Sequence, residues 1–461
     1  MIMPRSRLVD LWDRMQASYW FLPFVMFLIA VVVAIAMVRL DVYVWRNSPE
    51  ASRWFPSFEA EAARSILSTI ASGMLTVTGI VFSLTIVSLQ LASSQFGPRL
   101  LRTFMTSRAN QLVLGTFTAT FIYCLIVDGT VRGHLDFVPQ LATAGGILLG
   151  IIDIAVLIFF IHHVATSIRV ESVIANITED LHDVIEKLFR SEIGEPPADP
   201  REAEHEWREL SGSSRSICSR HAGYIRHIDD QMLLTAAREH DLILRIERTP
   251  GDFVVEGVQL ASAWPAERVS DETQDQIRLS VVLGPDRTPR QDVGLAIRQL
   301  VEVALRALSP GINDPFTALE CINRLGEGLC RVVRRHRPSR YRTDVDDRIR
   351  VIAEPVGLAT MTRAAFDPIA RAGGDNGDVM IRLLETVVMV AFCANREEDR
   401  TFLIDYARAL KRQSDTQLPL ARDRAHVAER FEHALQALER SESPPPSGDV
   451  AAVPERSPEP A

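Results

Sequence analysis

The sequence predicts a multispanning α-helical membrane domain with four transmembrane helices, followed by a cytosolic α+β module and a mainly α-helical domain. Four long apolar stretches in the first third of the chain indicate the membrane domain, because each could cross a hydrocarbon core as a helix. Mixed strand-like and helix-like patterns between about residues 213 and 290 indicate the module. Helical periods after residue 291 indicate the last domain.

The predicted membrane domain covers residues 1–167, with spans at about residues 19–38, 68–91, 111–127 and 141–164. The first span is long enough to cross the bilayer core. No small-residue cleavage pattern closes it, because the charged Arg39 and Asp41 follow, so we expect a retained span and not a signal peptide. The lipid bilayer is therefore an expected partner.

The loop charges predict the orientation of these spans. The loop after the second span contains Arg99, Arg102 and Arg108 but no acidic residue, whereas the loop after the third contains one arginine against two acidic residues. The positive-inside rule places the first of these loops in the cytoplasm. We therefore expect a multi-pass protein of the bacterial inner (plasma) membrane with cytoplasmic N- and C-termini.

The second span carries a stripe of small and polar residues. At about 100° per residue, one narrow face collects Ser72, Thr76, Gly79, Ser83, Gln90, Ser94 and Gly97. One interpretation is a helix-packing seam, and the other is a hydrated path lined by hydroxyls and the Gln90 amide. Either needs a neighbouring helix, from the same chain or from another copy, so a homo-oligomer is expected.

Asp153 lies among Ile and Leu in the fourth span, where an ionisable group is costly unless it is paired or hydrated. Thr116, Thr120 and Cys124 recur at four-residue spacing in the third span and could form an opposing wall. The hypothetical polar path through the membrane consists of Ser72, Thr76, Ser83, Gln90 and Asp153.

The soluble part divides into predicted segments at 168–212 (juxtamembrane helix and linker), 213–290 (small α+β module), 291–440 (helical domain) and 441–461 (disordered tail). In the module, YIRHID, LILRIE and IRLSVVLG predict strands, DQMLLTAAREH predicts a helix, and Pro250-Gly251-Asp252 predicts a turn. From Asp292 onward the pattern predicts helices throughout, with a second, looser helix break at Asp367-Pro368.

The segment RALSPGINDPFTALECINRL, Arg306–Leu325, cuts a strong helical pattern in two. We expect Ser309-Pro310-Gly311 to end the first helix, because proline cannot continue the hydrogen-bond ladder and glycine takes the left-handed stop. Asp314 and Pro315 suit the N-cap and the first turn of the next helix. These capping roles account for most of a corner between two helices.

Polar residues around this corner exceed what a turn requires, which raises the alternative of a binding site. A helix start offers free backbone N–H groups that suit a small anionic ligand. The candidate ligand-binding residues are Arg287, Thr288, Gln291, Asp292, Arg306, Ser309, Asn313, Asp314 and Thr317.

Composition argues against several other classes of protein. A net charge of −9 does not suit a nucleic-acid binder. The five cysteines show neither paired close spacing nor an accompanying His pattern, so no disulfide framework or metal site is expected. The sequence contains neither a phosphate-binding glycine loop in its strand and Lys context nor a nucleophile elbow. We expect no catalytic residue, no cofactor and no enzymatic activity.

Five blocks of the sequence carry a further likeness: FSLTIVSLQLASSQFGPRLLRTF, FFIHHVATSIRV, PGDFVVEGVQL, DRTPRQDVGLAIRQLVEVALRALSPGINDPFTA and AAFDPIARAG. They resemble signature blocks of a bacterial family of predicted membrane proteins, domain of unknown function 2254, from the first span to about Leu438. The family pattern falls on Pro98, Arg99, His163, Gly251, Asp252, Arg287, Thr288, Gln291, Asp292, Arg306, Ser309, Pro310, Asn313, Asp314, Pro315 and Thr317. Phe316 stands where the pattern has a more polar residue. Because the family has no assigned activity, the resemblance implies a membrane location and leaves the function open.

Two hypotheses of different classes follow. In the first, the chain is an oligomeric channel or transporter-like protein, regulated by a small ligand bound to its cytosolic domain. In the alternative, it is a non-transporting membrane-anchored scaffold or sensor that docks a cytosolic partner.

Overall fold

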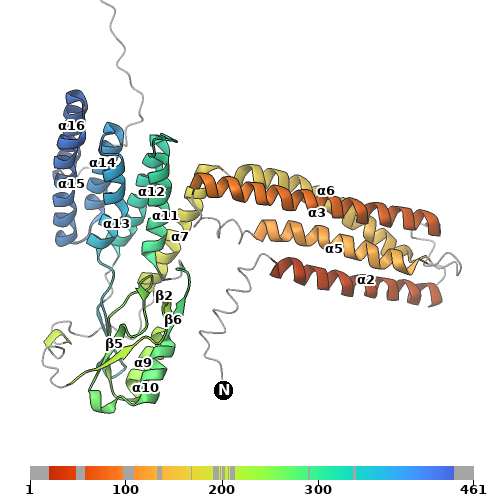
Figure 1. Ribbon diagram of the computed structural model, residues 1–461, viewed down its shortest axis with the longest axis horizontal. Helices are drawn as coiled ribbons and strands as arrows, with labels where there is room; N and C mark the ends of the chain where they lie inside the picture. The colour runs from red at the N-terminus through yellow and green to blue at the C-terminus, as the bar shows by residue number, and fades with distance from the viewer. Residues whose placement is uncertain are drawn as a thin grey trace, which may run out of the picture. The chain divides into compact units, whose positions relative to one another are not determined.

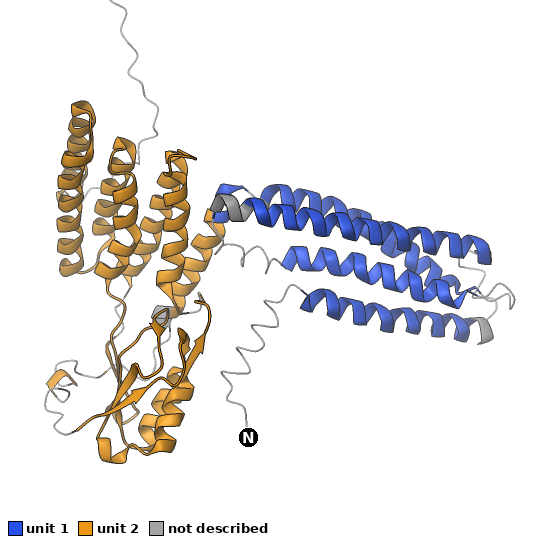
Figure 2. Cartoon of the chain, viewed as in Figure 1, with its two compact units in different colours: residues 1–173 blue, residues 174–461 orange. Residues whose placement is uncertain are grey.

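The computed structural model forms two compact units, residues 1–173 and residues 174–461 (Figure 2). It describes residues 20–47, 58–96, 108–131, 138–167, 169–190, 197, 199, 203–205, 207, 213–288, 291–335 and 339–440. Pro98, Arg99, Arg102, most of the predicted linker and the predicted disordered tail lie outside these residues. The finer domain boundaries stay predictions.

The first unit contains α2 (Phe21–Asn47), α3 (Ala60–Phe96), α5 (Arg108–Thr130) and α6 (Gln140–Ser167) (Figure 1). All four are long and apolar enough to cross a membrane. Helix α5 packs against the other three and is the most buried of the four. Glycine allows close approach of α6, because a Cβ at Gly146 would lie 2.8 Å from Leu67 Cδ2 and 3.4 Å from Cys124 Sγ. The four predicted apolar helices are thus confirmed.

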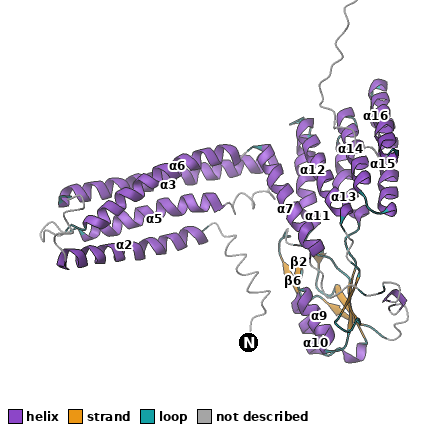
Figure 3. Cartoon of the chain, turned by 180° about the vertical axis from the view of Figure 1, so that it is seen from behind, coloured by secondary structure: helices purple, strands orange, loops and turns teal. Residues whose placement is uncertain are grey.

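The second unit begins with α7 (Val170–Arg190, from Ile174 onward) and contains two sheets, drawn as orange strands in Figure 3. The strands are β1 (Arg215–Cys218), β2 (Gly223–Ile228), β3 (Ile243–Ile246), β4 (Phe253–Val254), β5 (Gln259–Trp264), β6 (Val281–Gly284), β7 (Tyr341–Thr343) and β8 (Ile349–Ala353). The five-stranded sheet has the order β1-β5-β3-β8-β7, in which β3 and β8 pair in parallel and the other neighbours are antiparallel. The antiparallel three-stranded sheet has the order β4-β2-β6. The strands predicted at YIRHID and LILRIE are confirmed as β2 and β3.

Helices α9 (Asp230–Glu239) and α10 (Asp271–Ser280) and the 3₁₀ turn η3 (Ala266–Arg268) complete this mixed part. Its core includes Ile225, Leu233, Leu244 and Ile277. The strand predicted at IRLSVVLG is wrong over its first half, because α10 continues to Ser280 before β6 begins. Ser270 caps this helix by accepting a hydrogen bond from the Thr273 N–H at 3.1 Å.

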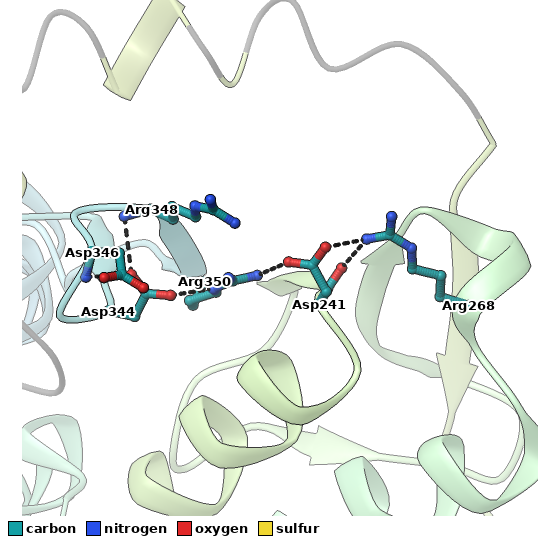
Figure 4. A network of polar contacts seen from close by, with 6 residues as sticks. All are labelled: Asp241, Arg268, Asp344, Asp346, Arg348 and Arg350. Atoms are coloured by element: carbon teal, nitrogen blue, oxygen red, sulfur yellow. Dashed lines mark hydrogen bonds and ion pairs between the residues drawn. The ribbon is translucent and has the colours of Figure 1, made fainter.

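The expectation of helices throughout from Asp292 onward is wrong at β7 and β8, which join the five-stranded sheet. The hairpin of β7 and β8 buries Arg350 and Asp344, which pair with each other (Figure 4). Arg350 Nε donates to Asp344 Oδ2 and its Nη1 donates to Asp241 Oδ1, each at 2.7 Å. Asp344 Oδ1 also accepts the backbone N–H groups of Asp346 and Arg348. This charged pair is therefore buried at the β8-β7 end of the five-stranded sheet.

Further helices complete the second unit: α11 (Val293–Ala307), α12 (Pro315–Arg334), α13 (Leu358–Ala372), α14 (Gly377–Cys393), α15 (Glu397–Gln417) and α16 (Ala421–Glu439). Helix α12 packs against α11, α13 and α14, and α14 packs against α15 and α16. The predicted break at Asp367-Pro368 is wrong, because Pro368 lies inside α13. Phe366 and Ile369 on either side of it are buried, and the helix continues to Ala372, with Gly373 as its C-cap.

Candidate functional site

Asp153 lies at the middle of α6, the last apolar helix, with its side chain 1% exposed. Neither carboxylate oxygen has a hydrogen-bond partner among the described residues. The Thr120 hydroxyl of α5 lies beside this carboxylate without reaching hydrogen-bond geometry, and the Cys124 thiol follows one turn later on α5. The cluster of Asp153, Thr120 and Cys124, here called the Asp153 cluster, is therefore a buried polar site with unused hydrogen-bonding capacity.

The polar stripe of α3 lies on a different surface from the Asp153 cluster. Ser72, Thr76, Ser83 and Gln90 are at least partly exposed on the single chain, whereas Asp153 is buried. The Thr76 hydroxyl donates to the Ser72 carbonyl of its own helix at 2.9 Å. The Ser94 side chain and Gly97 lie outside the described residues. Within one chain, the five residues predicted to line a polar path do not share a surface.

Asp41 lies beyond the predicted end of the first span and is not among the candidate site residues. In the structure it lies in α2, 7% exposed, and its two carboxylate oxygens accept the backbone N–H groups of Leu141 and Ala142 at 2.9 and 2.8 Å. These amides belong to the first turn of α6, whose N–H groups have no partner inside the helix. The Tyr123 hydroxyl donates to the Ala142 carbonyl at 2.8 Å. Asp41 thus joins α2 to α6.

In the second unit, Arg287 and Asp292 form a buried ion pair at the start of α11. Arg287 Nε donates to Asp292 Oδ2 at 2.6 Å and its Nη2 donates to Oδ1 at 2.8 Å, a two-pronged geometry. Asp292 is 4% exposed and also accepts the Leu295 N–H at 3.0 Å as the N-cap. Gly251 (φ +96°) packs on the pair, since a Cβ there would lie 2.4 Å from Asp292 Oδ2.

Gln291 and Thr288 bind the edge of β2 beside this pair. The Gln291 side chain accepts the Ile228 N–H at 3.0 Å and donates to the Ile228 carbonyl at 3.2 Å. The Thr288 hydroxyl donates to the Arg226 carbonyl at 3.3 Å. Four of the nine candidate ligand-binding residues therefore form a joint between the three-stranded sheet and α11, and their polar groups are used in that joint.

The corner lies at the other end of α11. Ser309 Oγ donates to the Arg306 carbonyl, and Asp314 caps α12 by accepting the Thr317 N–H at 3.2 Å and the Thr317 hydroxyl at 2.6 Å. The predicted left-handed stop at Gly311 is wrong. Asn313 takes that conformation (φ +51°), which an asparagine tolerates at small cost. The predicted N-cap Asp314 is confirmed.

The nine candidate residues thus form two groups and not one. Helix α11 separates Asp292 from the corner by 15 residues, which at 1.5 Å per residue is about 22 Å. A small ligand cannot contact both groups. At the corner, Asn313 is exposed, and the apolar Ile312 and Phe316 are 50% and 67% exposed.

Four helices long and apolar enough to cross a membrane, followed by a unit of two sheets and a block of helices, are the features of a helical membrane protein. The chain belongs to the family of predicted membrane proteins of unknown function, domain of unknown function 2254, whose model matches residues 16–389. An uncharacterized protein of Mycobacterium bovis is 32% identical over 411 residues, covering 85% of this chain and 76% of the relative. An uncharacterized protein of Mycobacterium tuberculosis strain H37Rv gives the same values. No solved structure matches the chain.

Proposed function

We propose that this chain is an oligomeric transporter-like or channel-like protein of the bacterial inner membrane, in which Asp153 binds the transported proton or small cation. The observation that carries the proposal is the carboxylate at the middle of α6, which has no hydrogen-bond partner among the described residues. A charged carboxylate in an apolar bundle is costly unless it holds a proton or a counter-cation. The Thr120 hydroxyl facing it supplies a further oxygen for either.

The stripe of α3 supports self-association. Its hydroxyls and the Gln90 amide are at least partly exposed on the single chain, in a helix that lipid would otherwise surround. Small and hydroxyl-bearing residues allow helices to approach closely in membranes and to form hydrogen bonds between them. A second copy of α3 would satisfy this face, either as a dry seam or around a hydrated path. Cytoplasmic termini follow from the positive-inside rule applied to the loop arginines.

Regulation by a small anionic ligand belongs to the same proposal, at the corner alone. The first turn of α12 offers backbone N–H groups beyond the one that Asp314 accepts. A specific observation favours the alternative function, a scaffold that docks a partner: Ile312 and Phe316 expose apolar surface at this corner. An apolar partner surface would cover these side chains, whereas an anion would not.

The test is ion flux through the full-length protein reconstituted in liposomes. We expect Asp153→Asn, which keeps the shape and removes the ionisable group, to abolish proton or cation flux. Glu61→Gln, which changes an exposed acid in the first turn of α3, is the control and should retain it. Flux equal to protein-free liposomes in the wild type, or unchanged flux in Asp153→Asn, would exclude transport through this carboxylate.

The stripe is tested by Ser83→Leu and Gln90→Leu in the same assay, together with the mass of the complex in detergent. Loss of flux with an unchanged complex mass indicates a conducting path. Loss of the complex itself indicates a packing seam.

A further inference from the structure

Cys330 and Cys393 lie 63 positions apart in the sequence, yet α12 and α14 bring their thiols into contact. The two thiols lie close enough that each is the main influence on the pKa of the other. Arg334, one turn after Cys330 on α12, donates from Nη2 to Cys393 Sγ at 3.3 Å. Both cysteines are partly exposed, whereas Cys321 on the same helix is fully buried. The sequence spacing gave no sign of this pair, because it arises from the packing of two helices.

The surroundings of Cys393 favour its thiolate. Cys393 is the last residue of α14, where the helix dipole opposes a negative charge. The adjacent Cys330 thiol, and after it the charge and hydrogen bond of Arg334, outweigh burial and lower the pKa of the Cys393 thiol to about 6. The neighbouring Cys393 thiol and, after it, burial raise the pKa of Cys330. Cys393 is therefore the more readily ionised thiol of the two, and Cys330 stays protonated beside it.

The backbone around the pair is held in place. Asn395, two residues after Cys393, donates from its side chain to the Arg334 carbonyl at 2.8 Å. The ends of α12 and α14 are therefore tied together where the two thiols meet. A reactive thiolate, a neighbouring thiol and solvent access are the features of cysteines that oxidise reversibly.

We propose that Cys393 and Cys330 form a peroxide-sensitive dithiol site that closes to a disulfide between α14 and α12. The Cys393 thiolate attacks one oxygen of hydrogen peroxide, the O–O bond breaks, and the departing hydroxide takes a proton to become water. Cys393 is then a sulfenic acid. The Cys330 sulfur attacks it, the S–S bond forms, and the sulfenic hydroxyl leaves as water with the Cys330 proton. Two electrons pass from the two sulfurs to the peroxide.

The test treats the full-length protein in membranes with hydrogen peroxide, blocks free thiols with maleimide, and identifies peptides by mass spectrometry without reduction. We expect a linked Cys330–Cys393 peptide that a dithiol reductant separates. In Cys330→Ser, oxidation should stop at a Cys393 sulfenic acid that a cyclic dione traps. Cys218, which is also partly exposed, is the control and should form no such link.

A second measurement follows Cys393 alkylation by maleimide at pH 6 before oxidation. If Arg334→Gln raises the pKa of Cys393 by one unit from about 6, the thiolate fraction at pH 6 and the rate fall roughly fivefold, while Arg334→Lys restores most of the rate. Maleimide-resistant Cys321 in each variant reports that the core around α12 is folded. Absence of the linked peptide in the wild type, or equal alkylation of Cys393 and Cys218, would overturn the proposal.

Discussion

Removing Arg287 should leave the Asp292 carboxylate buried without its counter-charge. Asp292 is 4% exposed, and among the described residues it would keep the Leu295 N–H as a hydrogen-bond donor. Breaking one side of a buried ion pair costs about 3–5 kcal/mol of unfolding free energy. Asp292→Asn should cost less, about 1–3 kcal/mol, because an asparagine still caps α11. The double variant should cost less than the sum, since neither charge is then stranded.

The assay is native-state hydrogen exchange of the α11 amides in the full-length protein in detergent. If the free energy of opening this joint falls by about 3 kcal/mol, amides that exchange through that opening exchange roughly 10²-fold faster. Arg298→Ala, on the exposed face of the same helix, is the control and should change the free energy by about 0.5 kcal/mol or less. Similar exchange in Arg287→Ala and Arg298→Ala would refute a stabilising role for the pair.

Three further predictions concern buried contacts. Burial alone would raise the pKa of Asp344, but hydrogen bonds from Arg350 and from two backbone N–H groups lower it. The ionised Asp344 therefore stabilises the fold at pH values above its pKa in the unfolded chain. This stabilisation is lost as the pH falls through its pKa in the folded chain. Acid titration by circular dichroism should therefore show a smaller pH dependence below about pH 4 in Arg350→Gln, and an unchanged dependence would contradict this role. Asp41→Ala leaves two α6 amides unpaired and should lower the detergent melting temperature by more than exposed Leu40→Ala, at a cost of about 1–3 kcal/mol. Gly326→Ala places a Cβ 2.2 Å from Thr386 Cγ2, at the contact between α12 and α14. Urea unfolding should show a destabilisation of about 1–3 kcal/mol. Gly311→Ala, which has open space around it, is the control and should be nearly neutral.

The apolar helices could be predicted from sequence because an apolar run of bilayer length is rare in chains that do not enter a membrane. The strands β7 and β8 could not be, because YRTDVDDRIRVIA reads as polar. Arg350 and Asp344 are buried there because they pair across the hairpin, with Asp241 and two backbone N–H groups as further partners, and no period in the sequence reveals this pairing. Local propensity fails where charges compensate one another inside the fold.

The candidate ligand site shows a different limit. Capping chemistry correctly predicted Asp314 as the start of α12, because a cap depends on its immediate neighbours. Grouping Arg287 with Asn313 treated nearness in sequence as nearness in space. The helical pattern between them already implied a rod of about 22 Å, so this separation could be predicted from the sequence by helix geometry.

Asp41 and Asp153 are both buried in the same apolar bundle, but only Asp41 has a structural role in the hydrogen bonds of the described residues. Asp41 lies where α6 begins, and its oxygens satisfy amides that the helix cannot satisfy itself. Asp153 lies in the middle of α6, where the backbone N–H groups are already bonded within the helix. No capping role is open to it there. Under the proposed function, a bound proton or cation would offset the cost of burying this carboxylate.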